Sequence, residues 1–76
     1  MNEELSLVER IKRYFQQRAT IWINGCDIEE LALGAGYKAS NASRRLRELA
    51  EEGYLDREER RGKRTKSVWY KWHDYL

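Results

Sequence analysis

Apolar residues recur along the chain first at helical and then at strand spacing, and the change of spacing marks where one element ends and the next begins. Steps of three and four residues predict a first helix from Ser6 to about Arg18. Ser6, with Glu9 three residues further on, is typical of a capping box, so we expect this helix to begin at Ser6. Its inward stripe comprises Leu7, Val8, Ile11, Tyr14 and Phe15.

A short strand should follow. The run Ile21-Trp22-Ile23 is β-branched and aromatic, and the Asn24-Gly25 pair after it is a strong turn signal. An isolated strand of this kind leaves its backbone groups unpaired, so we expect it to join a strand from later in the chain.

The second predicted helix begins at Asp27, because Glu30 three residues on completes a second capping box. Gly34 and Gly36 should end it in a tight turn. The expected inward positions are Ile28, Leu31, Ala32 and Ala35. A second and a third helix joined by such a turn are typical of a helix-turn-helix arrangement.

The third helix is predicted from Ser40, its expected cap, to Gly53, with a start that can fall one or two residues before Ser40. Ala42, Leu46 and Leu49 give it an apolar face. Its charges are sorted along the axis, with arginines early and glutamates late. Acids stabilise a helix start and bases its end by ~0.3–1 kcal/mol per group, so this order is unfavourable for an isolated helix. It indicates that the early half faces an anion. The alternative is a solvated face on which Arg44 pairs with Glu48 and Arg47 with Glu51.

The rest of the chain predicts an antiparallel hairpin. Residues 54–57 alternate polar and apolar, residues 58–66 have no apolar side chain and are expected to form a loop, and Ser67 to Trp72 form the second strand. Val68, Tyr70 and Trp72 should share one face. The chain's three tryptophans are expected in the core, although Trp69 falls with Lys71 on the opposite face of this strand; the alternative is that the tryptophans stack on bases. The aromatic tail could cover the core or form a dimer contact.

Composition narrows the class of protein. The chain has 76 residues, of which 41% are hydrophobic and 37% charged, and this balance favours one globular domain over residues 1–76 with its core at about 6–73.

The start Met1-Asn2-Glu3-Glu4 lacks the basic and apolar parts of a signal peptide, so we expect a cytoplasmic protein without a membrane segment. Cys26 and His73 stand alone and cannot supply the ligands of a metal site, so no metal or cofactor is expected. Cys26 is expected to be a small buried hydrophobe.

The order helix, short strand, helix, turn, helix, strand, basic loop, strand resembles the winged helix-turn-helix family of DNA-binding domains over about residues 6–73. The most specific part is S-R-R-L-R-E-L-A-E-E-G-Y-L-D at residues 43–56. The resemblance implies an α+β fold with a three-helix core, a small antiparallel sheet and one basic wing at about 58–66. It also implies binding to double-stranded DNA, as a transcriptional regulator or an accessory factor in DNA transactions.

That family places a recognition helix, here residues 40–52, in the major groove and the wing on the backbone or in the minor groove. Arginine reads guanine and asparagine reads adenine through paired hydrogen bonds, at ~1–3 kcal/mol of discrimination per pair. Serine hydroxyls and cations bind phosphates. The expected contacts from the helix and its approach are Lys38, Ser40, Asn41, Ser43, Arg44, Arg45 and Arg47, and those from the wing are Arg60, Arg61, Lys63, Arg64 and Lys66.

Other functions leave weaker signals. A protein-interaction module would dock an acidic partner through the basic surface and expose an apolar patch at Trp69, Tyr75 and Leu76. A homodimer on a two-fold DNA site is compatible with the DNA-binding interpretation, since one module gives modest specificity. An enzyme is not expected, because the sequence contains no nucleophile–base pair, paired carboxylate site or phosphate-binding glycine loop.

Overall fold

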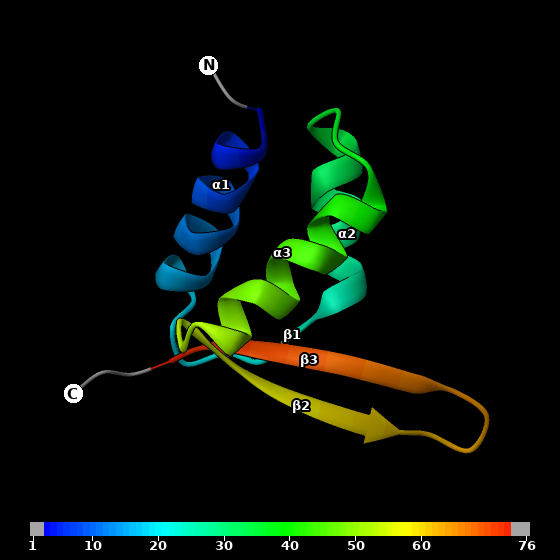
Figure 1. The fold of residues 1–76 in the computed structure, drawn as a ribbon. Helices are drawn as coiled ribbons and strands as arrows, with labels where there is room; N and C mark the ends of the chain where they lie inside the picture. Colours follow the sequence, from blue (N-terminus) through cyan, green and yellow to red (C-terminus); the bar gives the residue numbers. More distant parts are fainter. Residues whose placement is uncertain (1–2, 74–76) are drawn as a thin grey trace.

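The protein has three helices and a three-stranded antiparallel sheet, an α+β fold. A computed structural model describes residues 3–73. The helices are α1 (Glu3–Gln17), α2 (Gly25–Gly34) and α3 (Ala39–Glu51), and the strands are β1 (Ile23–Asn24), β2 (Leu55–Arg61) and β3 (Lys66–Trp72). Element types and order agree with the sequence prediction (Figure 1).

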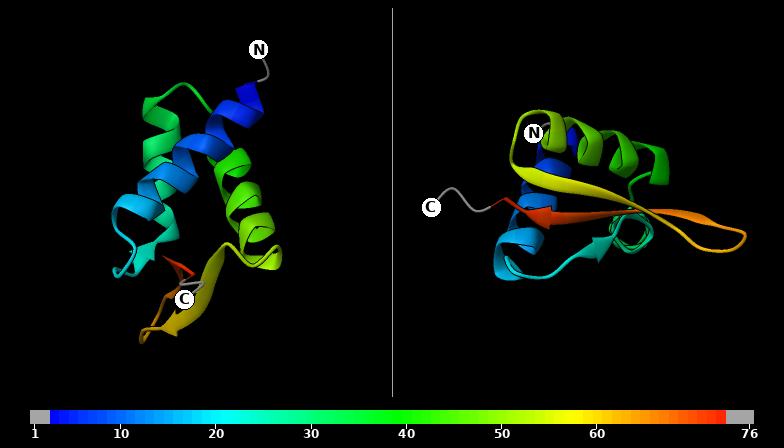
Figure 2. Two further views of the ribbon diagram at one scale, coloured as in Figure 1. Left: turned by 90° about the vertical axis from the view of Figure 1, so that its left-hand side faces the viewer. Right: turned by 90° about the horizontal axis from the view of Figure 1, so that it is seen from below.

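The sheet has the order β1-β3-β2, so β3 pairs on both sides. The three helices lie over one face of the sheet, and no described helix covers the other face (Figures 1 and 2). Beyond the helices, β2 and β3 continue as a projecting ribbon, which we call the hairpin (residues 55–72). The predicted antiparallel hairpin, with the short early strand at its edge, is therefore confirmed.

The core lies between the helices and the base of the sheet. Its largest fully buried side chains come from α1, α2 and α3: Phe15, Leu7, Ile11, Ile28 and Leu46. From the sheet, Tyr70 is 4% exposed, and Val68 and Trp72 pack against the same cluster. The predicted stripe on the first helix and the predicted inward face of β3 are both confirmed.

Glycines end the second and third helices, as predicted. Gly36 and Gly53 have φ angles of +91° and +92°, a conformation that costs glycine little and other residues more. After Gly36, the backbone N–H of Tyr37 donates to the carbonyl of Ala32 at 2.8 Å. The same bond recurs from Tyr54 to Leu49 at 2.9 Å. Each helix therefore closes with its last carbonyls satisfied and its chain turned back towards the next element.

The predicted starts of the first two helices are wrong, and the third helix begins within the one or two residues before Ser40 that the prediction allowed. The first helix begins at Glu3, so Ser6 lies inside it. The second is capped by Asn24, whose side-chain oxygen accepts a hydrogen bond from the Cys26 N–H at 3.0 Å, because β1 runs directly into α2. The third begins after Lys38, which makes no side-chain cap.

Several predicted burial positions are also wrong. The early strand, predicted at 21–23, lies at Ile23–Asn24, and Ile21 before it is 53% exposed. Of the predicted inward positions of the second helix, Leu31 is 41% exposed, and Ala35, which follows the end of α2, is also exposed. Ile28 and Ala32 are the two that are buried. The reason is that α2 packs chiefly on α3, which requires a narrow apolar stripe.

The predicted long loop at 58–66 is mostly strand. β2 extends to Arg61, and the connection between the strands is limited to residues 62–65. Backbone pairing with β3 continues to Arg61 opposite Lys66.

No described helix is long and apolar enough to cross a membrane. The predicted apolar patch at Tyr75 and Leu76 lies outside the described residues.

The cap assignment can be tested by two substitutions. Asn24→Ala removes the acceptor for the Cys26 N–H and should lower the free energy of unfolding by about 1 kcal/mol. Asp27→Ala removes an exposed acid from the first turn and should lower it by a few tenths of that amount. Urea unfolding followed by circular dichroism measures both; a larger loss from Asp27→Ala would contradict the assignment.

Candidate nucleic-acid interface

A hollow of about 390 Å³ lies between α3, the start of α2 and the hairpin. Arg47 borders it from α3, and Arg57 and Lys66 border it from β2 and β3. Three cations from separate elements therefore meet around one open space. Its floor is partly apolar, formed by Leu46 of α3 and by Val68 and Tyr70 of β3.

The outermost stripe of α3 carries the helix's contribution. Ser40, Arg44 and Arg47 are exposed and lie four and three residues apart, which places them along one side of the helix. Ser43 lies beside them and also borders the hollow. Within residues 3–73, neither Arg44 nor Arg47 forms an ion pair, so the local pairing with Glu48 and Glu51 that the sequence allowed is not formed.

Arg45 does not belong to this surface. It is two residues from Arg47, which on a helix of 3.6 residues per turn points it to nearly the opposite side. Its side chain is 15% exposed and forms an ion pair with Glu48. Asn41 is half-buried on that same flank. Of the predicted contacts on and before α3, the serines, Arg44 and Arg47 lie along one side, with the exposed Lys38 just before the helix, and Asn41 and Arg45 lie on the other flank.

The hairpin contributes the second part of the surface. Because side chains alternate along a strand, Arg57, Glu59 and Arg61 of β2 share the helix-facing side with Lys66 of β3. Arg61 and Lys66 are direct partners across the ladder. Like charges in that position destabilise a sheet, so this pair favours an anion beside it. Lys63 and Arg64 are exposed in the connecting turn.

Glu59 is the acid within this group of cations. One of its carboxylate oxygens, Oε1, lies 3.3 Å from an Arg57 nitrogen and 3.4 Å from Lys66 Nζ. The hydrogen bond and charge of Lys66 hold the pKa of Glu59 below its ordinary value. The pKa of Arg57 is raised, first by a hydrogen bond with Tyr70 and then by the charges of Tyr70 and Glu59. The side chains of Glu59 and Arg57 are therefore both charged at neutral pH.

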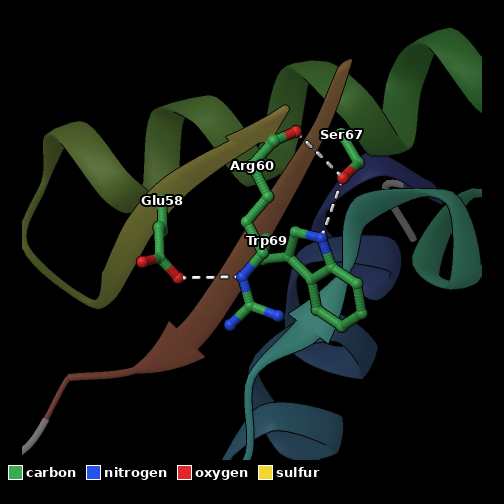
Figure 3. Close-up of polar contacts among 4 residues, drawn as sticks. All are labelled: Glu58, Arg60, Ser67 and Trp69. Carbon is green, nitrogen blue, oxygen red and sulfur yellow. Dashed lines mark hydrogen bonds and ion pairs between the residues drawn. The ribbon is translucent and has the colours of Figure 1, made fainter. Parts of the chain in front are cut away.

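Arg60, a predicted wing contact, lies on the other face of the hairpin. Its guanidinium stacks over the Trp69 ring at 4.4 Å and receives a further contact from Glu58, whose Oε2 is 3.0 Å from Arg60 Nε. Trp69 Nε1 donates to the Ser67 hydroxyl, and that hydroxyl donates to the Arg60 carbonyl (Figure 3). These four residues form a closed cluster that joins the two strands on the side away from α3.

Two further expectations are wrong. Trp22 and Trp69 do not pack in the core; both are half-buried on the outer face, where Lys71 lies 5.1 Å from the Trp22 ring. Cys26, expected to be buried, is exposed and borders the hollow. Arg57 was missed as a site residue. Its face follows from alternation with Leu55 inside the predicted strand at 54–57, but the expected contacts were confined to the basic segment 60–66.

The hollow suits a polyanion better than a small ligand. It is open, its bordering cations are exposed, and no three His, Cys, Asp or Glu side chains among the described residues cluster as metal ligands. A second hollow, of about 460 Å³, lies between α1 and α2. It has a mixed lining that includes Leu31, Arg10, Arg13 and Glu9, without cations converging from separate elements.

The Glu59 ion pairs give a pH dependence whose sign follows from the lowered pKa. A carboxyl group with a depressed pKa in the folded protein stabilises it above the ordinary value, here 4.5, and that stability is lost as pH falls through the folded pKa. Glu59→Gln should therefore flatten the fall in unfolding free energy below pH 4.5. Urea titrations at several pH values test this, and an unchanged slope would contradict it.

Comparison with known proteins adds no assignment, because no protein-family model, curated protein or solved structure matches the chain.

Proposed function

We propose that this chain is a winged helix-turn-helix protein that binds double-stranded DNA, with α3 in the major groove and the hairpin along the backbone. One observation carries the proposal: cations of α3 and of both hairpin strands, Arg47, Arg57 and Lys66, border the same hollow. A role as a transcriptional regulator or as an accessory factor in DNA transactions is part of this proposal.

The position of the charges along α3 supports this orientation. The basic, N-terminal half of α3 lies towards the end from which the hairpin turn projects, whereas its acidic C-terminal end lies near the base of the hairpin (Figures 1 and 2). A DNA duplex lying against the basic half and the hairpin turn would therefore stay clear of Glu51 and Glu52. The charge order that is unfavourable for the helix alone becomes favourable beside a polyanion.

Each side chain then has a distinct role. Arg44, on the outermost stripe, is placed to read a guanine edge, and Arg47 lies one turn further on. Ser40 and Ser43 lie in the first turns of the helix, where hydroxyls and the positive helix start bind phosphate oxygens. From the hairpin, Arg61, Lys66 and the turn residues Lys63 and Arg64 bind phosphates of the flanking backbone.

Neighbouring arginines on opposite faces of β2 provide a matched test. Arg61→Gln removes a cation from the helix-facing side, so affinity for duplex DNA should fall several-fold and the slope of log affinity against log salt should decrease by ~0.9. Arg60→Gln removes the same charge from the outer face and should leave the slope unchanged. Fluorescence anisotropy with a random-sequence duplex at several salt concentrations measures both.

Equal slopes for the two variants would contradict the placement of the duplex against the helix-facing side. Because Arg60→Gln also removes the stack on Trp69, near-ultraviolet circular dichroism should accompany the binding data to show that the hairpin is still formed.

The single cysteine of the sequence gives an independent test. Cys26 is exposed and borders the hollow, so a bound duplex should slow its alkylation by iodoacetamide in proportion to occupancy. The control is the double variant Cys26→Ser, Ala35→Cys, which moves the thiol to an exposed position just after the C-terminal end of α2, outside the lining of the hollow. Equal protection of both thiols, or of neither at saturating DNA, would contradict the proposed binding face.

A further inference from the structure

Glu59 occupies the place that the proposed function assigns to a phosphate. A single carboxylate oxygen bridges Arg57 and Lys66, at 3.3 Å and 3.4 Å, on the side of the hairpin that faces α3. Both cations also border the hollow. A phosphate oxygen entering between them would make the same two contacts.

These contacts are suited to being exchanged. The side chains of Arg57, Glu59 and Lys66 are 42%, 37% and 54% exposed, so water and ions reach all three. Exposed ion pairs contribute little to folding, because water screens them and the side chains lose freedom. The distances of 3.3–3.4 Å also exceed those of a close charge-assisted hydrogen bond.

The adjacent acid on β2 differs in its surroundings. Glu58 lies on the outer face, where its Oε2 is 3.0 Å from Arg60 Nε and where the Arg60 guanidinium is also stacked on Trp69. Glu58 therefore belongs to the closed cluster of Figure 3, on the face away from α3. Two acids in consecutive positions thus pair with cations on opposite sides of the same strand.

We propose that Glu59 is an internal counter-anion of the DNA-binding surface, which holds Arg57 and Lys66 until a backbone phosphate displaces it. The inference rests on the proposed function. Displacing Glu59 offsets part of the gain from each phosphate contact, so the residue lowers sequence-independent affinity for DNA. When the phosphate contacts contribute less to the affinity, the base contacts of α3 contribute a larger share of it, and binding depends more on DNA sequence.

The test compares Glu59→Gln with Glu58→Gln, which make the same charge change on opposite faces. Glu59→Gln leaves two more cations for phosphates, so affinity for a random-sequence duplex should rise about tenfold at low salt and the salt slope should steepen by ~1–2, at ~0.9 per phosphate. Glu58→Gln should change affinity less than about twofold, through the net charge alone, with the slope unchanged. Equal effects of the two substitutions would overturn the inference.

A second variant separates this role from that of an ordinary link between strands. Lys66→Gln should lower affinity more in the Glu59→Gln background than in the parent protein, because Lys66 is then released from its carboxylate; the double-mutant cycle measures this coupling. If Glu59 serves only to join the strands, Glu59→Gln will lower the melting temperature without raising affinity, and the cycle will show no coupling in binding.

The outcomes distinguish the two proposals. If the parent chain binds duplex DNA and Arg61→Gln weakens it more than Arg60→Gln, while Glu59→Gln and Glu58→Gln behave alike, the counter-anion role fails and DNA binding stands. If neither the parent chain nor any variant binds duplex DNA at low salt, both proposals fail.

Discussion

Tyr70 connects the core to the candidate interface, and the arrangement of the sheet depends on it. It is the Cα partner of Ile23 on one side and of Arg57 on the other, and it is 4% exposed beneath the helices. Its ladder partner Arg57 lies on the same face of the sheet and borders the hollow, as Tyr70 does. Because the same side chain is buried in the core and contacts the hollow, the direction of the hairpin is fixed relative to α3.

The start of α2 packs closely against the same strand. A Cβ atom on Gly25 would lie 3.3 Å from the Val68 carbonyl oxygen and 3.4 Å from a carbon of the Tyr70 ring. The approach to the Val68 oxygen is tighter than an ordinary van der Waals contact, so glycine lets α2 and β3 come together. With β1 running into α2 without a loop, the helix start, the sheet and the floor of the hollow form one packed unit.

The elements that could be predicted from the sequence are those specified by apolar spacing or by glycine. The α1 stripe, the glycine ends of α2 and α3 and the inward face of β3 follow from such local patterns. The start of α2 could not be predicted, because Asn24 caps this helix only when β1 runs directly into it. The strand character of residues 58–61 depends on pairing with β3, which overrides an entirely polar sequence.

For the candidate interface, the sequence identified the two cationic segments but not the side that each cation faces. Arg45 and Arg60 are as basic as their neighbours, and their exclusion follows from helical and strand geometry combined with specific partners, Glu48 and Trp69. The outer-face positions of Trp22 and Trp69 depend on the register of β3 against both neighbouring strands. Such information resides in the tertiary structure and not in the composition of a segment.

The alternation along β2 has a consequence for how such a chain can vary. Deleting Asp56 or Arg57 would exchange the two faces of the rest of β2, bringing Glu58 and Arg60 to the helix-facing side and turning Glu59 and Arg61 to the outer side. Insertions or deletions in the turn at 62–65 leave the faces of the β2 and β3 side chains unchanged, because that segment lies beyond the last paired residues. Related sequences should therefore tolerate insertions at the turn and keep the length of β2 constant.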